Sequence, residues 1–237
     1  ITLAPVDPWY RFYFPDGTQF DYGGTLEDTL SEISKFDPSD TEGYLKLLKH
    51  SQHIFEVAFD ELSDQPFHEF SLLFKTTPSL VKLKSYKTVW QLVSTYLKNE
   101  KSRQAFSIQP LLLGGNPFDT TCIYSLIHFL ERKWGIYFPI GGTGALVQAL
   151  KKLMGEEGIK ITTNSTIEKI VVENKVTKGV MIESGRKVSA DIVVSNADPM
   201  HMYDCMISTR EQSITARVKQ RLSKISMGLY VLYFGTR

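Results

Sequence analysis

A segment in the middle of the chain, residues 136–150 with the sequence IYFPIGGTGALVQAL, separates two different sequence patterns. Helical periodicity dominates before it, and short runs rich in Val and Ile dominate after it. Its own pattern predicts a brief extended piece, a tight turn at residues 141–144 and then a helix with Leu146, Val147 and Leu150 on one face. Glycines allow a ligand to approach the backbone, and the free amides of a helix start favour a polar or anionic group. We therefore expect a cofactor near this turn.

The turn itself is a poor match to a dinucleotide phosphate loop. Gly142 and Gly144 supply the first two positions of G-x-G-x-x-G, but the third position falls on Val147. The strand expected over residues 159–163 also does not end in the acidic residue that would bind a ribose. A tight strand-to-helix turn is the preferred interpretation.

Composition restricts the class of partner. The 237 residues are enough for a sizeable core in one large or two small domains. A net charge of +1 gives no general attraction to nucleic acid, so we expect no nucleic-acid partner. Cys122 and Cys205 lie among apolar residues without metal-type spacing, which favours buried free thiols in a reducing compartment over a disulfide. No apolar run approaches the roughly 20 residues that span a bilayer, so any membrane contact is expected at the surface.

Local signals place a hairpin and several helices in the first half. Residues 9–22 alternate and turn at a Pro-Asp-Gly sequence, which predicts a β-hairpin. Thr25 with Asp28, and Ser39 with Glu42, have the spacing of a reciprocal cap at a helix start. A further helix is expected from Asp119 to Lys133, with Gly135 as its C-terminal cap.

Two charged patterns in this half each leave two interpretations open. His50, His53 and Glu56 stand one helical turn apart. They are either metal ligands or part of a solvated helix face, and the solvated face is the preferred interpretation. Residues 67–97 carry large apolar residues at helical spacing with four interspersed lysines. That segment is either a basic amphipathic helix lying in a membrane interface or a core helix with lysines on its wet side.

The second half predicts short strands joined by turns, with two helices after them. Turns are expected at Asn174 and at Ser184-Gly185. A helix is expected to open at Asp198, and another over residues 212–222. The expected strands are residues 159–163, 165–172, 176–183, 187–195 and, at the end, 228–236.

The search for catalytic side chains finds no nucleophile motif and no metal-protease motif. Trp134, Tyr137 and Phe138 lead instead into the glycine turn, a lining that suits an apolar substrate and chemistry carried out by a cofactor. An ordinary core has the same composition, so these residues alone indicate no more than an α+β chain.

Three segments resemble one enzyme family. RQAFSIQPLLLGGNPF (residues 103–118), IYSLIHFLERKWGIYFPIGGTGALVQAL (123–150) and VVSNAD (193–198) are similar to the bacterial-type phytoene desaturases. These are FAD-dependent carotenoid desaturases of the flavin amine oxidase-like superfamily. The resemblance implies an α+β fold, with a mainly helical substrate and membrane domain (1–140), part of a β-rich, Rossmann-type FAD-binding domain (141–207), and a return to the substrate domain (208–237).

The resemblance also implies site residues. The family's glycine turn near substrate and flavin matches a substrate-binding set: Tyr137, Phe138, Pro139, Gly141, Gly142, Thr143 and Gly144. Its adenine-side strand and the SNAD segment match a FAD-binding set: Ile167, Ser195, Asn196, Ala197 and Asp198. Ile167 stands where the family has a Val, a harmless change if only backbone groups bond. No catalytic acid or base is assigned.

The departures from the family pattern concern both ends. The family begins with a strand, G-x-G-x-x-G and a ribose-binding acid, and ends with a second glycine-rich flavin segment, and neither occurs here. We therefore expect an internal piece of a longer enzyme that alone does not hold FAD tightly and is inactive.

The implied activity is the removal of two hydrogens across a C–C single bond of a phytoene-like polyene, with hydride passing to flavin. A substrate that dissolves only in lipid favours a cytoplasmic protein docked on the membrane surface through residues 67–97. Two alternatives remain open: a flavoprotein of the same fold that isomerises or saturates polyenes, and a non-catalytic membrane-binding or partner-binding module.

Overall fold

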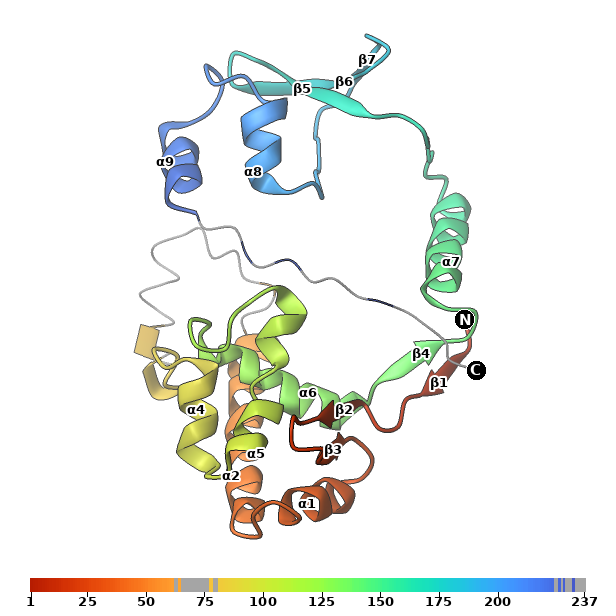
Figure 1. Cartoon of the computed structure of the whole chain (residues 1–237). Helices are drawn as coiled ribbons and strands as arrows, with labels where there is room; N and C mark the ends of the chain where they lie inside the picture. The colour runs from red at the N-terminus through yellow and green to blue at the C-terminus, as the bar shows by residue number, and fades with distance from the viewer. Residues whose placement is uncertain are drawn as a thin grey trace. The chain divides into compact units, whose positions relative to one another are not determined.

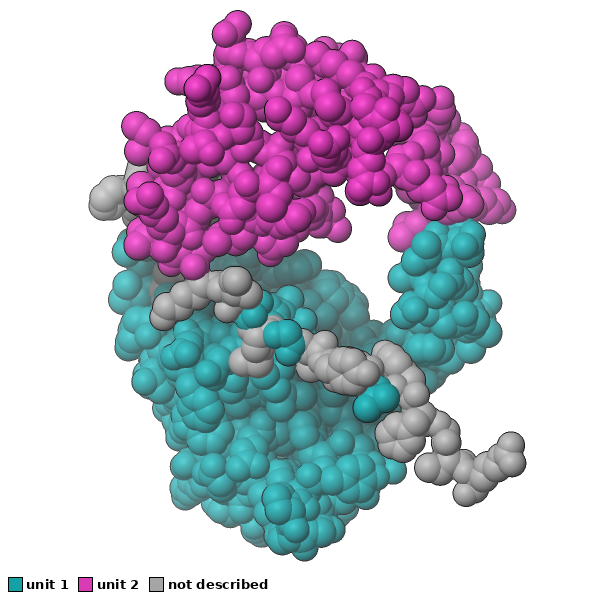
Figure 2. Space-filling view, turned by 45° about the horizontal axis from the view of Figure 1, so that its top comes forward, with its two compact units in different colours: residues 1–149, 226–237 teal, residues 150–225 magenta. Residues whose placement is uncertain are grey.

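The computed structural model describes residues 1–61, 64, 77, 78, 81–223, 226, 228 and 232. The chain divides into two compact units, one of residues 1–149 with 226–237 and one of residues 150–225. Figure 2 colours the first unit teal and the second magenta. The domain boundaries expected at residues 140 and 207 concern the functional domains of the enzyme and stay a prediction.

The first unit is mainly helical and carries two small antiparallel ribbons, β1 with β4 and β2 with β3 (Figure 1). Its elements begin with β1 (Leu3–Pro5), β2 (Tyr10–Tyr13), β3 (Gln19–Tyr22), α1 (Leu26–Ser34), α2 (Asp40–Phe55), the π-helix η1 (Glu56–Glu61), α4 (Val89–Tyr96) and α5 (Glu100–Ala105). They continue with the 3-10 helices η2 (Gln109–Leu113) and η3 (Cys122–Ser125), then α6 (Leu126–Trp134), β4 (Tyr137–Pro139) and α7 (Thr143–Glu156), whose end passes into the second unit.

The second unit contains a three-stranded antiparallel sheet in the order β5-β6-β7 and short helices after it. Its elements are β5 (Ile167–Glu173), β6 (Val176–Ile182), β7 (Lys187–Ser189), α8 (Pro199–His201), the π-helix η4 (Met202–Met206) and α9 (Ile214–Leu222).

The hairpin predicted over residues 9–22 is confirmed as β2 paired with β3, in a register that sets Tyr10 opposite Tyr22. Gly17 takes a φ of +81°, which its missing Cβ makes cheap. The Asp16 carboxylate accepts a hydrogen bond from the backbone N–H of Thr18 at 3.1 Å. The turn residues therefore form the hairpin by the local chemistry that the sequence indicated.

Of the two reciprocal caps, one is confirmed and one is wrong. Thr25 and Asp28 bond each other's backbone N–H at the start of α1. Ser39 instead has helical backbone angles and its side chain makes no capping bond. The buried carboxylate of Asp40, the next residue, accepts the backbone N–H groups of Lys98 and Asn99 at 2.7 and 2.9 Å. A tertiary contact thus anchors this helix start, next to a local turn in which the Asp37 carboxylate accepts the N–H of Ser39 at 2.9 Å.

The helix expected from Asp119 begins later. Residues 117–120 form turns, Thr121 caps η3, and α6 follows from Leu126. Gly135, with a φ of +73°, ends α6 as predicted.

In the second unit the strands predicted within residues 165–183 are confirmed as β5 and β6. Their two-residue connection, Asn174 and Lys175, has positive φ at both positions, which matches the right-handed twist of a hairpin. Residues 159–163 are not a strand, and the strand expected over 187–195 ends at Ser189. The helices expected at Asp198 and within 212–222 are present, whereas the closing strand over 228–236 lies largely outside the described residues.

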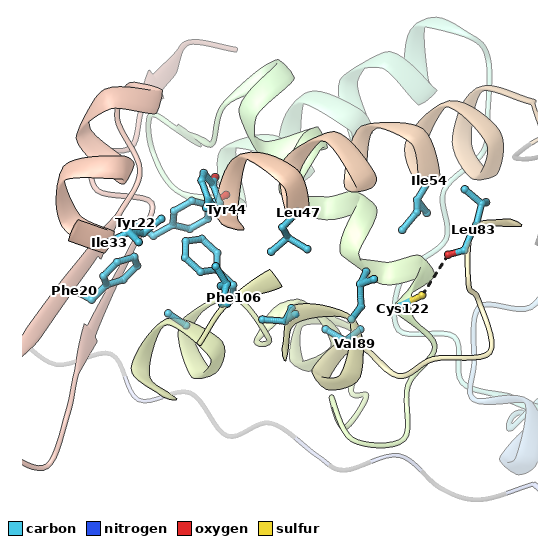
Figure 3. Packing of buried hydrophobic residues seen from close by; sticks show 14 of the residues in the cluster. Phe20, Tyr22, Ile33, Tyr44, Leu47, Ile54, Leu83, Val89, Phe106 and Cys122 are labelled. Atoms are coloured by element: carbon cyan, nitrogen blue, oxygen red, sulfur yellow. Dashed lines mark hydrogen bonds between the residues drawn. The ribbon is translucent and has the colours of Figure 1, made fainter. Parts of the chain in front are cut away.

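The buried core of the first unit is aromatic at one end and aliphatic at the other (Figure 3). Phe106 is fully buried and its ring lies 4.7 Å from that of Tyr44 and 5.2 Å from that of Tyr22. Cys122 is a buried free thiol that donates to the carbonyl of Lys84, as expected, but Cys205 is exposed, which corrects the prediction for it. No helix among the described residues is both long enough and apolar enough to cross a membrane.

Candidate functional site

The glycine turn joins β4 to α7, as the sequence predicts. The N–H of Gly142 donates to the carbonyl of Pro139 at 2.9 Å, and the N–H of Ala145 donates to the carbonyl of Gly142 at 3.0 Å. Gly141 and Gly142 have φ of +90° and +78°, a region that side chains with a Cβ rarely adopt. These two positions therefore need glycine for the turn itself.

Gly144 is different, because nothing in the backbone requires it. It lies in the first turn of α7 without a positive φ, and an added Cβ would meet no atom within 4 Å. The same open space surrounds Gly142. The turn thus leaves room for another molecule to approach the main chain.

Aromatic side chains form an exposed path to this turn, which we call the aromatic band: Phe59, Trp134, Tyr137 and Phe138. Each of these four residues exposes between 40% and 53% of its surface. The rings of Phe59 and Trp134 lie 6.0 Å apart, and both pack on Phe55, at 5.0 and 5.7 Å. Trp134 ends α6, and β4 carries Tyr137 and Phe138 directly into the turn.

The helix after the turn also exposes its apolar face. None of its residues is buried, and the exposed apolar side chains follow helical spacing: Leu146, Val147, Leu150, Leu153 and Met154. The predicted substrate-binding residues, 137–139 and 141–144, therefore lie together in an apolar, open part of the structure.

The predicted FAD-binding residues all lie in the second unit. Ile167 begins β5 and pairs with Ile182 of β6. Ser195, Asn196, Ala197 and Asp198 are exposed, and the Asp198 carboxylate caps α8 by accepting the N–H groups of Met200 and His201. Asp198 thus has a structural role of its own.

A hollow of about 380 Å³ lies beside this cap, lined by Pro199 and Met200 of α8, by Tyr203 of η4 and by residues of α9. The predicted substrate and FAD residues belong to different units.

Between β2 and α6 is a buried polar network that the sequence reasoning missed. The hydroxyl of Tyr10 on β2 donates to Oε1 of Glu131 on α6 at 2.9 Å. Burial raises the pKa of Glu131 to about 7, against the Tyr10 hydrogen bond, which lowers it. The other carboxylate oxygen has no hydrogen-bond partner. This glutamate therefore holds its proton up to near-neutral pH.

His128, one turn earlier on α6, is completely buried. Its Nε2 lies 3.0 Å from the carbonyl of Phe106, and its Nδ1 lies 3.1 Å from Nε2 of Gln109. A ring whose Nε2 carries the hydrogen and whose Nδ1 accepts from Gln109 satisfies both contacts. Burial lowers the pKa of His128 to about 4, so the ring is neutral at physiological pH.

Arg132 completes the network and ties α6 to the hairpin. Its guanidinium donates to the carbonyl of Gly24 at 2.8 Å and to the hydroxyl of Thr29. It also lies over the ring of Trp9, 4.7 Å from the centroid. Because α6 leads directly into β4, these contacts position the strand that carries the glycine turn.

The helical pattern of α6 gave no signal for this network. Its apolar residues, among them Leu126, Leu130 and Trp134, lie on the side of the helix opposite His128, so the pattern predicts His128 to be exposed. The structure instead buries His128 and Glu131, and a buried polar side chain of this kind is usually hydrogen-bonded.

The solvated-face interpretation of His50, His53 and Glu56 agrees with the structure in one respect and needs refinement in another. No group of residues in the described ranges could hold a metal ion. His53 and Glu56 are exposed, but His50 is half-buried and hydrogen-bonded by both ring nitrogens.

Comparison with known proteins identifies the family. Residues 2–229 match the flavin containing amine oxidoreductases, and the chain belongs to this family. Among curated relatives, it is 37% identical over 99% of its length to a phytoene desaturase (lycopene-forming) of Pantoea ananas, covering 48% of that protein. It is 38% identical to a phytoene desaturase (lycopene-forming) of Pseudescherichia vulneris, with the same coverage of both chains.

A phytoene desaturase (neurosporene-forming) of Cereibacter sphaeroides is 34% identical over the whole chain, which covers 46% of that protein. The chain thus spans about half the length of the curated relatives it matches. The expected α+β fold of the flavin amine oxidase-like type and the expected family are confirmed, and a flavin is the cofactor that the family name implies.

Proposed function

We propose that the protein carries out FAD-dependent desaturation of phytoene or a related carotenoid precursor. The observation that supports this most is the aromatic band, which leads along Trp134 and β4 to an open glycine turn. A long apolar polyene is complementary to such a path, because flat conjugated segments pack well against aromatic rings. Relatives named phytoene desaturases, similar over the full length of the chain, support the same substrate class.

The chain's own residues would bind and orient the substrate. Gly142 and Gly144 leave the main chain open, so the polyene can lie against the turn without a Cβ in the way. Aromatic and aliphatic side chains around it exclude water and hold one C–C bond in place. The flavin would supply the chemistry by accepting a hydride from that bond.

FAD fits these residues in part. The open turn at the start of α7 offers free backbone N–H groups and space for a flat ring system. The sequence has no complete G-x-G-x-x-G following a strand, so we assign the FAD pyrophosphate to residues beyond these 237. These residues alone are therefore expected to bind FAD weakly and to be inactive.

The proposal includes docking of the protein on the cytoplasmic membrane surface, because the substrate dissolves in lipid. The expected docking segment, residues 67–97, lies partly outside the described residues. In its described part, Val81 is 58% exposed and Tyr86 is 72% exposed, on either side of Lys82 and Lys84. The other apolar residues of this part are buried in the core: Leu83, Val89, Leu92, Val93 and Leu97. The proposed docking surface therefore consists of Val81 and Tyr86 beside the lysines.

The test uses the protein expressed from its complete open reading frame. It is incubated without air with FAD and phytoene-loaded liposomes, and the visible spectrum of the extracted pigment is recorded. New long-wavelength polyene bands that depend on FAD are expected. Bound flavin with unchanged phytoene would favour the isomerase or saturase alternative, and no flavin binding would overturn the proposal in favour of a binding module.

A matched pair of glycines tests the site. Gly144→Leu places a side chain at the turn, whereas Gly155→Leu places the same side chain further along α7, where nothing lies within 4 Å either. Both changes suit a helix. We expect Gly144→Leu to lower pigment formation by about tenfold or more, as a misplaced substrate does, and Gly155→Leu to leave it nearly unchanged. Equal activity of the two variants would remove the turn from the substrate site.

A further inference from the structure

A second hollow lies in the first unit, away from the glycine turn, between α2 and the segment leading to α4. Its volume is about 570 Å³, within the roughly 300–1,000 Å³ of ligand pockets. One helical face of α2 forms one wall and Lys82 with Tyr96 the other. The lining residues on α2 and just after it are Lys46, Lys49, His50, Gln52, His53 and Glu56.

His50 fixes the base of this pocket. Its Nδ1 lies 2.8 Å from the hydroxyl of Tyr96 on α4, and its Nε2 lies 3.2 Å from the carbonyl of Leu83. A carbonyl only accepts, so Nε2 carries the hydrogen and Nδ1 accepts from the tyrosine. Burial lowers the pKa of His50, in keeping with a neutral ring that holds the two walls together.

The charges in the pocket are not balanced. Three lysines line it, against one glutamate. Glu56 lies 3.8 Å from His53 and accepts from Gln52, and Lys46 pairs with Glu42 at 2.7 Å. Within the described ranges, no carboxylate forms an ion pair with Lys49 or Lys82. Lys49 and Lys82 therefore line opposite walls of the pocket without an ion-pair partner among the described residues, and Glu56 is the carboxylate that shares the pocket with them.

We propose that this pocket binds the phosphate of an anionic phospholipid headgroup, with Lys49 and Lys82 as its charged contacts. The exposed Val81 is adjacent to Lys82 in the chain and gives this wall an apolar neighbour, as a site at a lipid surface requires. The proposal rests on the membrane docking proposed above and deepens it, because it makes docking selective for anionic lipid.

The test measures sedimentation of the complete protein with vesicles of phosphatidylcholine alone and with about one third phosphatidylglycerol. Two lysines near an anionic surface are expected to favour the anionic vesicles by about tenfold to thirtyfold at low salt. Lys49→Gln with Lys82→Gln should abolish most of this preference. The matched control, Lys151→Gln with Lys160→Gln, removes the same charge at two exposed lysines outside the pocket and should retain the preference within about twofold.

Three results would overturn the proposal. The first is equal binding of wild-type protein to both vesicle types. The second is an equal loss in the pocket and control variants, which indicates general charge attraction. The third is calorimetric binding of inorganic phosphate that the pocket variant abolishes while vesicle binding is unchanged, which indicates a soluble ligand.

The pigment assay separates this proposal from the proposed function. Pigment formation without a preference for anionic vesicles overturns the headgroup site and leaves the desaturase standing. A preference that depends on Lys49 and Lys82 in a protein that makes no pigment supports the site and overturns the desaturase.

Discussion

The two units follow the same rules of hydrophobic patterning but use their apolar side chains differently. In the first unit, apolar residues of α2, α4 and the hairpin close on a common core in which Ile54, Leu92 and Phe106 are fully buried. In the second, Ile170 is the buried hydrophobic residue among those described, and α8 and α9 bury none. Secondary structure therefore forms in both units, whereas a core forms in one.

The difference shows that periodicity specifies which face of an element is apolar and does not specify what covers it. Val194 is 91% exposed and Ile214 is 80% exposed in the second unit. Sheets and helices are stable when such faces pack on another layer. Among the described residues, turns and strand pairing therefore hold the second unit's sheet more than burial does.

The sharpest test of this comparison makes the same substitution, isoleucine to alanine, once in each unit. Ile54→Ala, in the core of the first unit, is expected to lower the free energy of unfolding by about 3–4 kcal/mol. Ile170 is 7% exposed. Ile170→Ala should lower the free energy of unfolding by about 1 kcal/mol or less, because the surroundings of this residue collapse more easily. Trp9, Trp90 and Trp134 all lie in the first unit, so urea unfolding followed by tryptophan fluorescence measures that unit.

Amide exchange of β5 and β6 measures the second unit. If Ile54→Ala does not fold, Ile54→Val keeps the comparison, with an expected cost of about 1 kcal/mol. Equal costs for Ile54→Ala and Ile170→Ala would mean that the second unit also has a closed core.

The next test asks whether strand pairing maintains the second unit. Gly179 on β6 has a φ of +129°, and an added Cβ would lie 2.0 Å from the carbonyl oxygen of Val188 on β7. Gly179→Ala should cost about 3 kcal/mol through this clash and the strained φ, and should expose β6 and β7 to amide exchange. The tryptophan signal of the first unit should not change.

Gly185→Ala is the control for backbone strain without a clash. Gly185 also has a positive φ, of +77°, but nothing lies within 4 Å of an added Cβ. We expect Gly185→Ala to lower the free energy of unfolding by about 1 kcal/mol. A similar cost at both glycines would show that the β6–β7 contact contributes little.

Local chemistry accounts for the features that the sequence predicted well. The turn at residues 15–17, the cap formed by Thr25 and Asp28, and the two-residue turn at Asn174 each depend on a few adjacent residues. Ser39 has the same motif as Thr25, yet it lies inside a turn in which the Asp37 carboxylate accepts its N–H, and its side chain makes no cap. The next residue, Asp40, binds the backbone of residues 98–99, which only the tertiary structure brings near. Cys205 has apolar neighbours in sequence but is exposed, since its unit lacks a closed core around it.

The candidate site likewise has parts that the sequence could predict and parts that it could not. The glycine turn and the aromatic residues before it are continuous in sequence, so their proximity could be predicted. The bond between Tyr10 and Glu131 spans 121 positions in the chain and could not. The sequence also could not predict that Lys49 and Lys82 line the same pocket, because the two lysines lie on different parts of the chain.

The last test concerns the polar interior that distinguishes the first unit. Because the pKa of Glu131 in the folded protein is about 7, above the 4.5 of an unfolded glutamate, the folded state binds the proton more tightly. Its contribution is fully present below about pH 4.5 and is lost as the pH rises through about 7. Glu131→Gln keeps an oxygen that accepts from Tyr10 and cannot ionise.

The variant should therefore match the wild type near pH 4.5 and exceed its free energy of unfolding by about 3 kcal/mol at pH 8. The pKa of His128, lowered to about 4, gives the opposite slope, with stability lost as the pH falls below about 6.5. His128 is present in the wild type and in the variant, so its effect cancels in the difference between their free energies of unfolding. The control is Glu168→Gln on β5, an exposed glutamate of the second unit, which should leave the tryptophan-detected unfolding of the first unit unchanged. A Glu131→Gln variant less stable than the wild type at pH 8 would mean that ionised Glu131 stabilises the interior through the charge of Arg132, and that the buried carboxyl group is not held in its protonated form.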